Sequence, residues 1–101
     1  MIAEFSISPV GESVSLSKWV AEVIRIVDES GLEHETNAMS TVVEGDWDAV
    51  MALIKKCHAK VLESSERAVT TIRIDDRKGA RGRIKGKIES IEKRLGRKIR
   101  K

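Results

Sequence analysis

The chain has 101 residues, of which 35% are charged and 41% hydrophobic, a size and composition typical of one soluble globular domain. It holds no apolar run long enough to cross a bilayer, and its first residues lack the basic start and apolar stretch of a signal peptide. Cys57 is the single cysteine and excludes an internal disulfide, so we expect a cytoplasmic protein.

The net charge of +3 is unevenly distributed. Residues 1–76 carry 7 Lys/Arg and 14 Asp/Glu, whereas residues 77–101 carry 12 Lys/Arg and 2 Asp/Glu. The chain is therefore an acidic body followed by a basic tail. Two interpretations stay open: the tail binds phosphates, as in nucleic acid, or it docks on the acidic body of its own or a neighbouring subunit.

The first elements follow from the spacing of apolar residues. Residues 2–8 alternate between apolar and polar side chains and are followed by Pro9 and Gly11, which predicts a half-buried strand. Ser15 is a candidate N-cap for the next helix, and Gly31 ends that helix. The apolar side of this helix has the spacing of an amphipathic helix and consists of Leu16, Trp19, Val20, Val23, Ile24 and Val27.

Residues 33–44 predict two short strands around a tight turn at 38–40, although neither Asn-Gly nor Asp-Gly marks the turn. Asp46 or Asp48 is expected to cap a second helix after Gly45. Its apolar side consists of Trp47, Val50, Met51, Ile54, Cys57, Val61 and Leu62. Residues 67–74 alternate again, a charged loop covers 75–82, and helical spacing resumes at Ile84, Ile88, Ile91, Leu95 and Ile99.

The order β-α-β-β-α-β-α predicts an α+β fold, the ferredoxin-like sandwich. A four-stranded antiparallel sheet is backed by two helices, and a C-terminal helix over 83–99 is added within a single domain of residues 1–101. One face of the sheet is then bare, and period two assigns to it Glu4, Ser6, Ser8, Thr71 and Arg73. Such a face suits a small polar ligand or a sheet-to-sheet contact between subunits.

Patterns for catalysis or metal binding are weak. Cys57 and His58 are adjacent on the predicted helix, where neighbouring side chains point about 100° apart, so they form no dyad. We expect Cys57 in the core and His58 at its rim. In segment 33–35 the histidine points away from both glutamates, and the carboxylates at 75–76 are explained by pairing with nearby basic side chains. We predict neither an enzyme nor a metal site.

Nucleic acid stays an alternative partner for the basic tail. Gly79–Gly82 has the spacing of the GXXG loop of KH domains, but that loop joins two helices, whereas this one follows a strand. RNA-binding sheets of this architecture stack bases on aromatic side chains. Trp19 and Trp47 are assigned to helices and Phe5 to the helix-covered face, so this platform is missing. The apolar stripe of the last helix favours a docked helix with a solvated basic face.

Four segments, in their order and spacing, resemble one family, the MTH1187/YkoF-like proteins, also called the UPF0045 or thiamine-binding protein family. The segments are Ser8-Pro9-Val10-Gly11, Ser15-Leu16-Ser17, Asn37 to Gly45, and Thr70 to Arg77. The resemblance implies a ferredoxin-like fold assembled through its sheets into homodimers and commonly homotetramers. It also implies binding of thiamine or its hydroxymethylpyrimidine part, without catalysis. The family's usual turn has Gly where this chain has Ser40, which adds a side chain where the backbone approaches a ligand.

An aminopyrimidine edge offers an amino donor and ring-nitrogen acceptors, which hydroxyl, amide and carboxylate groups match. We expect hydrogen bonds to the pyrimidine from Ser6, Ser8, Asn37, Ser40 and Thr41. Glu44 is expected to meet the amino group or the cationic thiazolium, and Trp19 or Met39 to cover a ring. Each also has an ordinary structural explanation in a strand, a turn or the core. No other cofactor is expected, and a structural assembly module is a further alternative.

Overall fold

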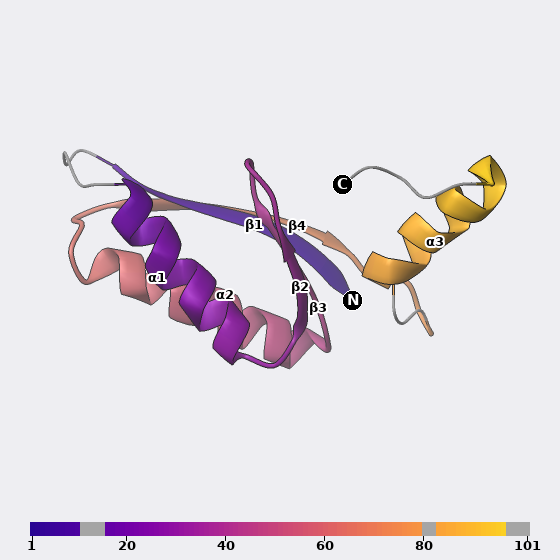
Figure 1. Ribbon diagram of the computed structural model, residues 1–101. Helices are drawn as coiled ribbons and strands as arrows, with labels where there is room; N and C mark the ends of the chain where they lie inside the picture. Colours follow the sequence, from indigo (N-terminus) through magenta and orange to yellow (C-terminus); the bar gives the residue numbers. More distant parts are fainter. Residues whose placement is uncertain (11–15, 80–82, 97–101) are drawn as a thin grey trace.

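The computed structural model describes residues 1–10, 16–79 and 83–96. The elements follow the predicted order (Figure 1) and are β1 (Ile2–Pro9), α1 (Leu16–Glu29), β2 (Glu33–Thr36), β3 (Thr41–Glu44), α2 (Trp47–Leu62), β4 (Ala68–Asp75) and α3 (Arg83–Leu95). Ser15, the predicted N-cap of α1, and residues 97–99 of the predicted last helix lie outside the described residues.

The four strands form one sheet in the order β2-β3-β1-β4, and every neighbouring pair is antiparallel. Helices α1 and α2 lie together against one face of this sheet (Figure 1). Two β-α-β units that interleave in this way are the ferredoxin-like sandwich. The predicted α+β fold is therefore confirmed.

The core lies between the sheet and the two helices. Ala3 and Phe5 of β1 and Val43 of β3 are buried against this layer, together with Val27 of α1 and Val50 of α2. Because side chains alternate along a strand, Glu4 and Ser6 of β1 belong to the other face. The bare face predicted from period two is thus confirmed.

Pairing of β1 with β4 places polar residues opposite one another on that bare face. Glu4 is paired with Arg73, and Ser6 with Thr71. Directly opposed residues of an antiparallel pair share one face of the sheet. The result is a polar surface on the side of the sheet away from α1 and α2.

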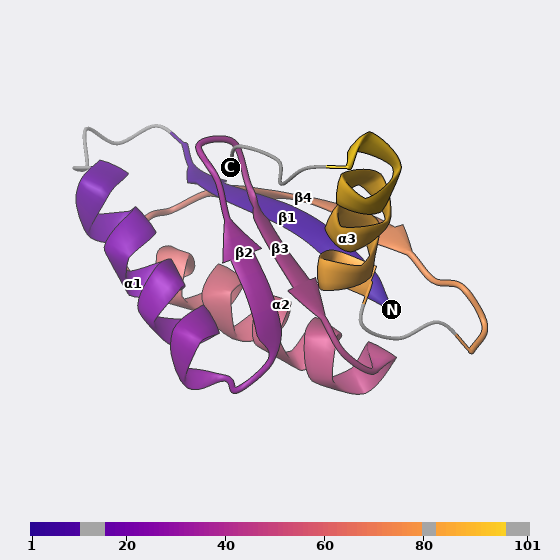
Figure 2. The same ribbon diagram turned by 45° about the vertical axis from the view of Figure 1, so that its right-hand side comes forward.

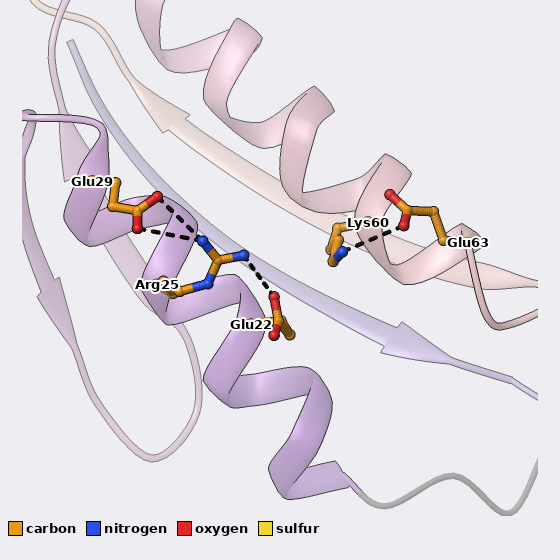
Figure 3. A network of polar contacts seen from close by, with 5 residues as sticks. All are labelled: Glu22, Arg25, Glu29, Lys60 and Glu63. Carbon is orange, nitrogen blue, oxygen red and sulfur yellow. Dashed lines mark hydrogen bonds and ion pairs between the residues drawn. The ribbon is translucent and has the colours of Figure 1, made fainter.

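The outer faces of α1 and α2 carry exposed ion pairs (Figure 3). Arg25 contacts Glu22 at 2.8 Å and Glu29 at 3.3 Å, and Lys60 contacts Glu63 at 3.3 Å. The hydrogen bond and charge of Glu22 raise the pKa of Arg25 above its ordinary value. Exposed pairs of this kind contribute little to stability, so these faces act as the solvated side of the domain.

Helix α3 lies beside the end of the sheet where β1 begins and β4 ends, away from α1 and α2 (Figures 1 and 2). The backbone N–H of Ile84 donates to Glu44 Oε1 at 3.2 Å. Ile91 and Leu95 remain 50% and 55% exposed. The start of α3 thus docks on β3, where Ile84 is half-buried, whereas the end of the predicted apolar stripe, at Ile91 and Leu95, is half-exposed in a single chain.

Three residues assigned to apolar helix faces are also partly exposed. Trp47 is 54% exposed because it is the first residue of α2, and Leu62, its last residue, is 43% exposed. Val20 of α1 is 51% exposed. Asp46 occupies the predicted N-cap position of α2 with extended backbone, but its side chain makes no capping hydrogen bond.

Candidate ligand pocket between the first strand, the first helix and the hairpin turn

The turn between β2 and β3 is organised by the side chain of Asn37. Its Oδ1 accepts hydrogen bonds from the backbone N–H groups of Met39 at 2.8 Å and Ser40 at 2.9 Å. The backbone N–H of Asn37 donates to the carbonyl oxygen of Ser40 at 3.0 Å. This is an Asx turn, in which an asparagine side chain replaces a backbone partner. The predicted turn is confirmed. The residue that indicates it in the sequence is Asn37, rather than an Asn-Gly or Asp-Gly pair.

Ser40 links this turn to the first strand. Its hydroxyl donates to Glu4 Oε2 at 2.8 Å, across 36 residues of sequence. A glycine at this position has no hydroxyl to make the link. The hydroxyl hydrogen is used in this bond, so Ser40 offers a ligand its oxygen lone pairs as an acceptor.

A pocket of about 230 Å³ opens where the turn approaches β1. Its walls are residues 5–9 of β1, residues 36–41 of the turn and the start of β3, one side of α1, and Val61 of α2. Strand β3 pairs with β1 only as far as Phe5, whereas β4 pairs with β1 as far as Pro9. The pocket therefore occupies the place along β1 where the neighbouring strand β3 has ended.

Seven of the eight predicted ligand residues line this pocket. They are Ser6, Ser8, Trp19, Asn37, Met39, Ser40 and Thr41. The eighth, Glu44, lies three residues beyond Thr41 on β3, about 10 Å further along an extended strand, and accepts the N–H of Ile84 from α3. The structure thus gathers the predicted set with the exception of Glu44, while ligand binding itself stays a prediction.

The pocket combines an apolar rim with a buried donor. Met39 is 85% and Val20 51% exposed at the rim, whereas Trp19 is only 5% exposed. Within the described part of the chain, the buried Nε1 of Trp19 has no hydrogen-bond partner. An unsatisfied buried donor costs about 1–3 kcal/mol, and buried tryptophans usually find a partner for this group. The unpaired indole N–H is a feature that sequence patterns do not report.

Cys57 and His58 lie outside the pocket. Cys57 is fully buried, and loss of solvation raises the pKa of its thiol to about 11, so the nucleophilic thiolate is disfavoured at neutral pH. His58 is half-buried, and its Nδ1 hydrogen-bonds to the hydroxyl of Thr70 on β4. The predicted placement of Cys57 in the core and His58 at its rim is confirmed.

The histidine of β2 turns toward the helices. His34 is paired with the buried Val43, lies 3.6 Å from Asp28 of α1 and contacts the carbonyl oxygen of Leu32 at 2.9 Å. It therefore points away from the neighbouring glutamates, as predicted. Over residues 1–10, 16–79 and 83–96, no three His, Cys, Asp or Glu side chains are grouped to hold a metal ion, and no helix has the length and apolar character of a membrane span.

Fold and pocket together define a ferredoxin-like sandwich with a small cleft beside its β2–β3 turn. The family model described as thiamine-binding protein matches residues 3–92, so the chain belongs to the thiamine-binding protein family. The UPF0045 protein MJ1052 of Methanocaldococcus jannaschii is 40% identical over 91 residues, which cover 90% of this chain and 91% of that protein. The UPF0045 protein YqgV of Bacillus subtilis is 35% identical over 100 residues, which cover 93% of this chain and 96% of that protein.

Solved structures show the same fold. The crystal structure of MJ1052 has a TM-score of 0.80 and covers 89% of this chain and 93% of its own. Thermotoga maritima TM0486, assigned provisionally to thiamine biosynthesis or salvage, has a TM-score of 0.77 at 21% identity and covers 89% and 96%. The latter likeness shows the shared fold alone. The family predicted from the four sequence segments is confirmed.

Proposed function

We propose that this protein binds thiamine or its hydroxymethylpyrimidine part in the pocket between β1, α1 and the β2–β3 turn, and that it does so without catalysis. One observation carries the proposal: the pocket brings together seven residues, from three separate segments, that were predicted to contact such a ligand. Membership of a family described as thiamine-binding supports the choice of ligand.

The chemistry of the walls matches a flat, polar-edged ring. Trp19, Val20 and Met39 supply an apolar slot. Ser6 and Ser8 line the pocket at the open edge of β1, where a ligand that reaches round this edge to the bare face would meet their hydroxyl groups, which both donate and accept. Because Oδ1 of Asn37 already accepts two turn hydrogen bonds, its amide nitrogen is the group that it presents to an acceptor on the ligand.

The size of the pocket favours one ring over a large ligand. Sites for drug-sized molecules measure about 300–1,000 Å³, whereas this pocket measures about 230 Å³. A single aminopyrimidine suits this volume better than two linked rings. The thiazolium of thiamine would then extend past the rim formed by Met39 and Val20.

Calorimetric titration of the protein with hydroxymethylpyrimidine and with thiamine tests the proposal. We expect saturable heat with both, with one ligand per pocket. An Ala38→Trp variant, which fills the mouth of the pocket from the turn, is expected to abolish the heat. Absence of heat with both ligands, using folded protein, would remove the proposed function.

We further propose that copies of the chain join into a homodimer or homotetramer through the bare sheet faces. Support comes from the uncovered polar face, which carries the Glu4–Arg73 register pair, and from the half-exposed Ile91 and Leu95 of α3. Analytical ultracentrifugation tests this. A monomer throughout the micromolar range contradicts it.

A second candidate is binding of nucleic acid or phosphate by α3. It is favoured by the exposed Lys93 and Arg94 on a helix that stands away from the two-helix layer. Phosphate contacts make affinity fall steeply with added salt. Gel-shift titrations with duplex and single-stranded DNA at low salt check this, and an unshifted probe excludes it.

A further inference from the structure

The last residues of β1 extend past the start of β3, and the hydrogen-bond pattern of the sheet determines the side to which each of their backbone N–H and C=O groups points. In an antiparallel pair, opposed residues alternate between exchanging two hydrogen bonds and exchanging none. The Met1 amino group donates to the carbonyl oxygen of Gly45 at 2.7 Å, and the Gly45 N–H donates to the carbonyl oxygen of Met1 at 3.0 Å. Counting in twos from Met1, residues 3, 5 and 7 direct their N–H and C=O toward the β3 side.

The opposite edge of β1 gives an independent count. The N–H of Val10 donates to the carbonyl oxygen of Arg67 at 2.8 Å, on the β4 side. Counting back in twos, residues 8, 6 and 4 are bonded to β4, so the odd-numbered residues again point to the β3 side. Both counts assign Ile7 to the side from which β3 is missing, because β3 begins at Thr41, opposite Phe5.

Ile7 also lines the pocket. Its N–H and C=O thus project from one residue, side by side, toward a space bounded by Trp19 and the Asn37 turn. Pro9 is the next residue with this direction, and as a proline it has no N–H to leave unpaired. The edge therefore presents one complete donor–acceptor pair, that of Ile7.

We infer that the Ile7 backbone N–H and C=O recognise the ligand by pairing with a donor–acceptor edge, as a missing β-strand would. The ligand class is a flat heteroaromatic ring with an amino group beside a ring nitrogen. The ring nitrogen accepts the Ile7 N–H, and the amino group donates to the Ile7 carbonyl oxygen. This inference rests on the proposed function and specifies how the pocket selects its ligand. A hydroxyl group can donate or accept and so distinguishes ligands poorly, whereas the fixed N–H and C=O of Ile7 select a ring with an acceptor beside a donor.

Amide hydrogen exchange followed by NMR tests the inference at single residues. With saturating 4-amino-5-hydroxymethyl-2-methylpyrimidine, we expect exchange at the Ile7 amide to slow at least about tenfold, the effect of one added hydrogen bond. The Ser8 amide, which faces β4, serves as the matched control and should not change. The benzene analogue, 2-aminobenzyl alcohol, lacks the ring nitrogens and should leave Ile7 unprotected.

Variants of Ile7 give a second measurement. Ile7→Pro removes the N–H without removing a bond to β4 and should weaken pyrimidine binding about tenfold or more. Ile7→Val keeps the amide and serves as the comparison variant, in which any change in affinity measures the side chain alone. Should the proline variant fail to fold, the exchange experiment on the parent protein decides.

The outcomes separate this inference from the proposed function. Calorimetric binding of the pyrimidine with unchanged exchange at Ile7 overturns the inference and leaves the function standing. Absence of binding overturns both. Protection of Ile7 that rises with protein concentration and is independent of ligand would assign the edge to a second copy of the chain, and would also overturn the inference.

Discussion

Asn37 builds the turn with its side-chain oxygen, and under the proposed function its amide nitrogen donates to the ligand. Asn37→Asp keeps an oxygen acceptor for Met39 and Ser40 but removes both N–H donors. We expect the fold to be retained and the affinity for neutral hydroxymethylpyrimidine to fall about tenfold, measured by calorimetry. Asn37→Ala, the comparison variant, should also loosen the turn. Undiminished affinity in Asn37→Asp would exclude this nitrogen as a ligand contact.

Ser40 contributes to stability through its bond to Glu4. Ser40→Ala should lower the free energy of unfolding by about 1–2 kcal/mol, because a hydrogen bond to a carboxylate is lost. Ser40→Gly should cost about 0.5–1 kcal/mol more, through the larger backbone entropy of glycine in the unfolded chain. Urea unfolding measures both. In a double-mutant cycle with Glu4→Ala, which removes the acceptor, purely additive effects would show that the bond contributes nothing.

The two tryptophans provide a matched pair of probes. Trp19 is buried and lines the pocket, whereas Trp47 is half-exposed and lies outside the pocket lining. We expect ligand binding to change the fluorescence of the Trp47→Phe variant, in which Trp19 is the emitter. The Trp19→Phe variant should show little change. The reverse pattern would move the ligand away from this pocket.

Cys57 makes stability depend on alkaline pH. Loss of solvation raises the pKa of its thiol from 9.0 to about 11 in the folded state. Above pH 9 the unfolded chain loses this proton while the folded chain keeps it, so stability falls as pH rises toward 11. Between pH 8 and pH 10 the contribution of Cys57 should fall by about 1 kcal/mol.

Urea unfolding of the parent protein and of Cys57→Ala at both pH values isolates this effect. The alanine variant is less stable overall because it leaves a cavity, but its decline between the two pH values should be smaller. Equal declines in the two proteins would mean that the thiol does not titrate differently on folding.

At the scale of the elements, the length of β3 creates the pocket. β3 has four residues and β1 has eight. The strands are antiparallel, so the first residue of β1, Ile2, lies opposite the last residue of β3, Glu44. The last residues of β1 therefore lack a neighbour on one side, and the Asx turn lies next to the gap. Strand pairing, rather than any single side chain, positions the site.

Helix α3 leaves two large apolar side chains, Ile91 and Leu95, half-exposed in a single chain. If copies associate, the double variant Ile91→Ser/Leu95→Ser should weaken the assembly and leave the circular dichroism spectrum unchanged, since both side chains are half-exposed in one chain. Sedimentation equilibrium checks this. Lys93→Ser, a change on the same exposed turn, is the control. An assembly equally stable in the double variant would exclude α3 from the interface.

At the scale of the whole molecule, the charges are separated along the chain. If copies associate, the acidic body of one copy would attract the basic segment 77–101 of another, and added salt would screen this attraction. The dissociation constant of an assembly held by this attraction should therefore be lower at low salt and higher at high salt. Ultracentrifugation at two salt concentrations measures the effect, and an assembly insensitive to salt would be held by apolar contacts instead.

The sequence by itself determined the type and order of the elements and which side of each strand meets the helices. These properties depend on local periodicity: Ala3 and Phe5 alternate with Glu4 and Ser6 whatever the distant residues do. It also contained the residues of the pocket. Asn37 marks the turn through its own side chain, and this signal can be read from the sequence once Asx turns are considered.

Only the tertiary structure decided which of those residues meet. Ser40 reaches Glu4 across 36 residues, Glu44 is directed to α3 rather than to the pocket, and α3 meets the sheet at one end only (Figures 1 and 2). Each outcome depends on where one strand ends against another and on how separate elements pack. Periodicity repeats within an element and carries no information about such distances, and for this reason the pocket and the open edge at Ile7 emerge only in the folded chain.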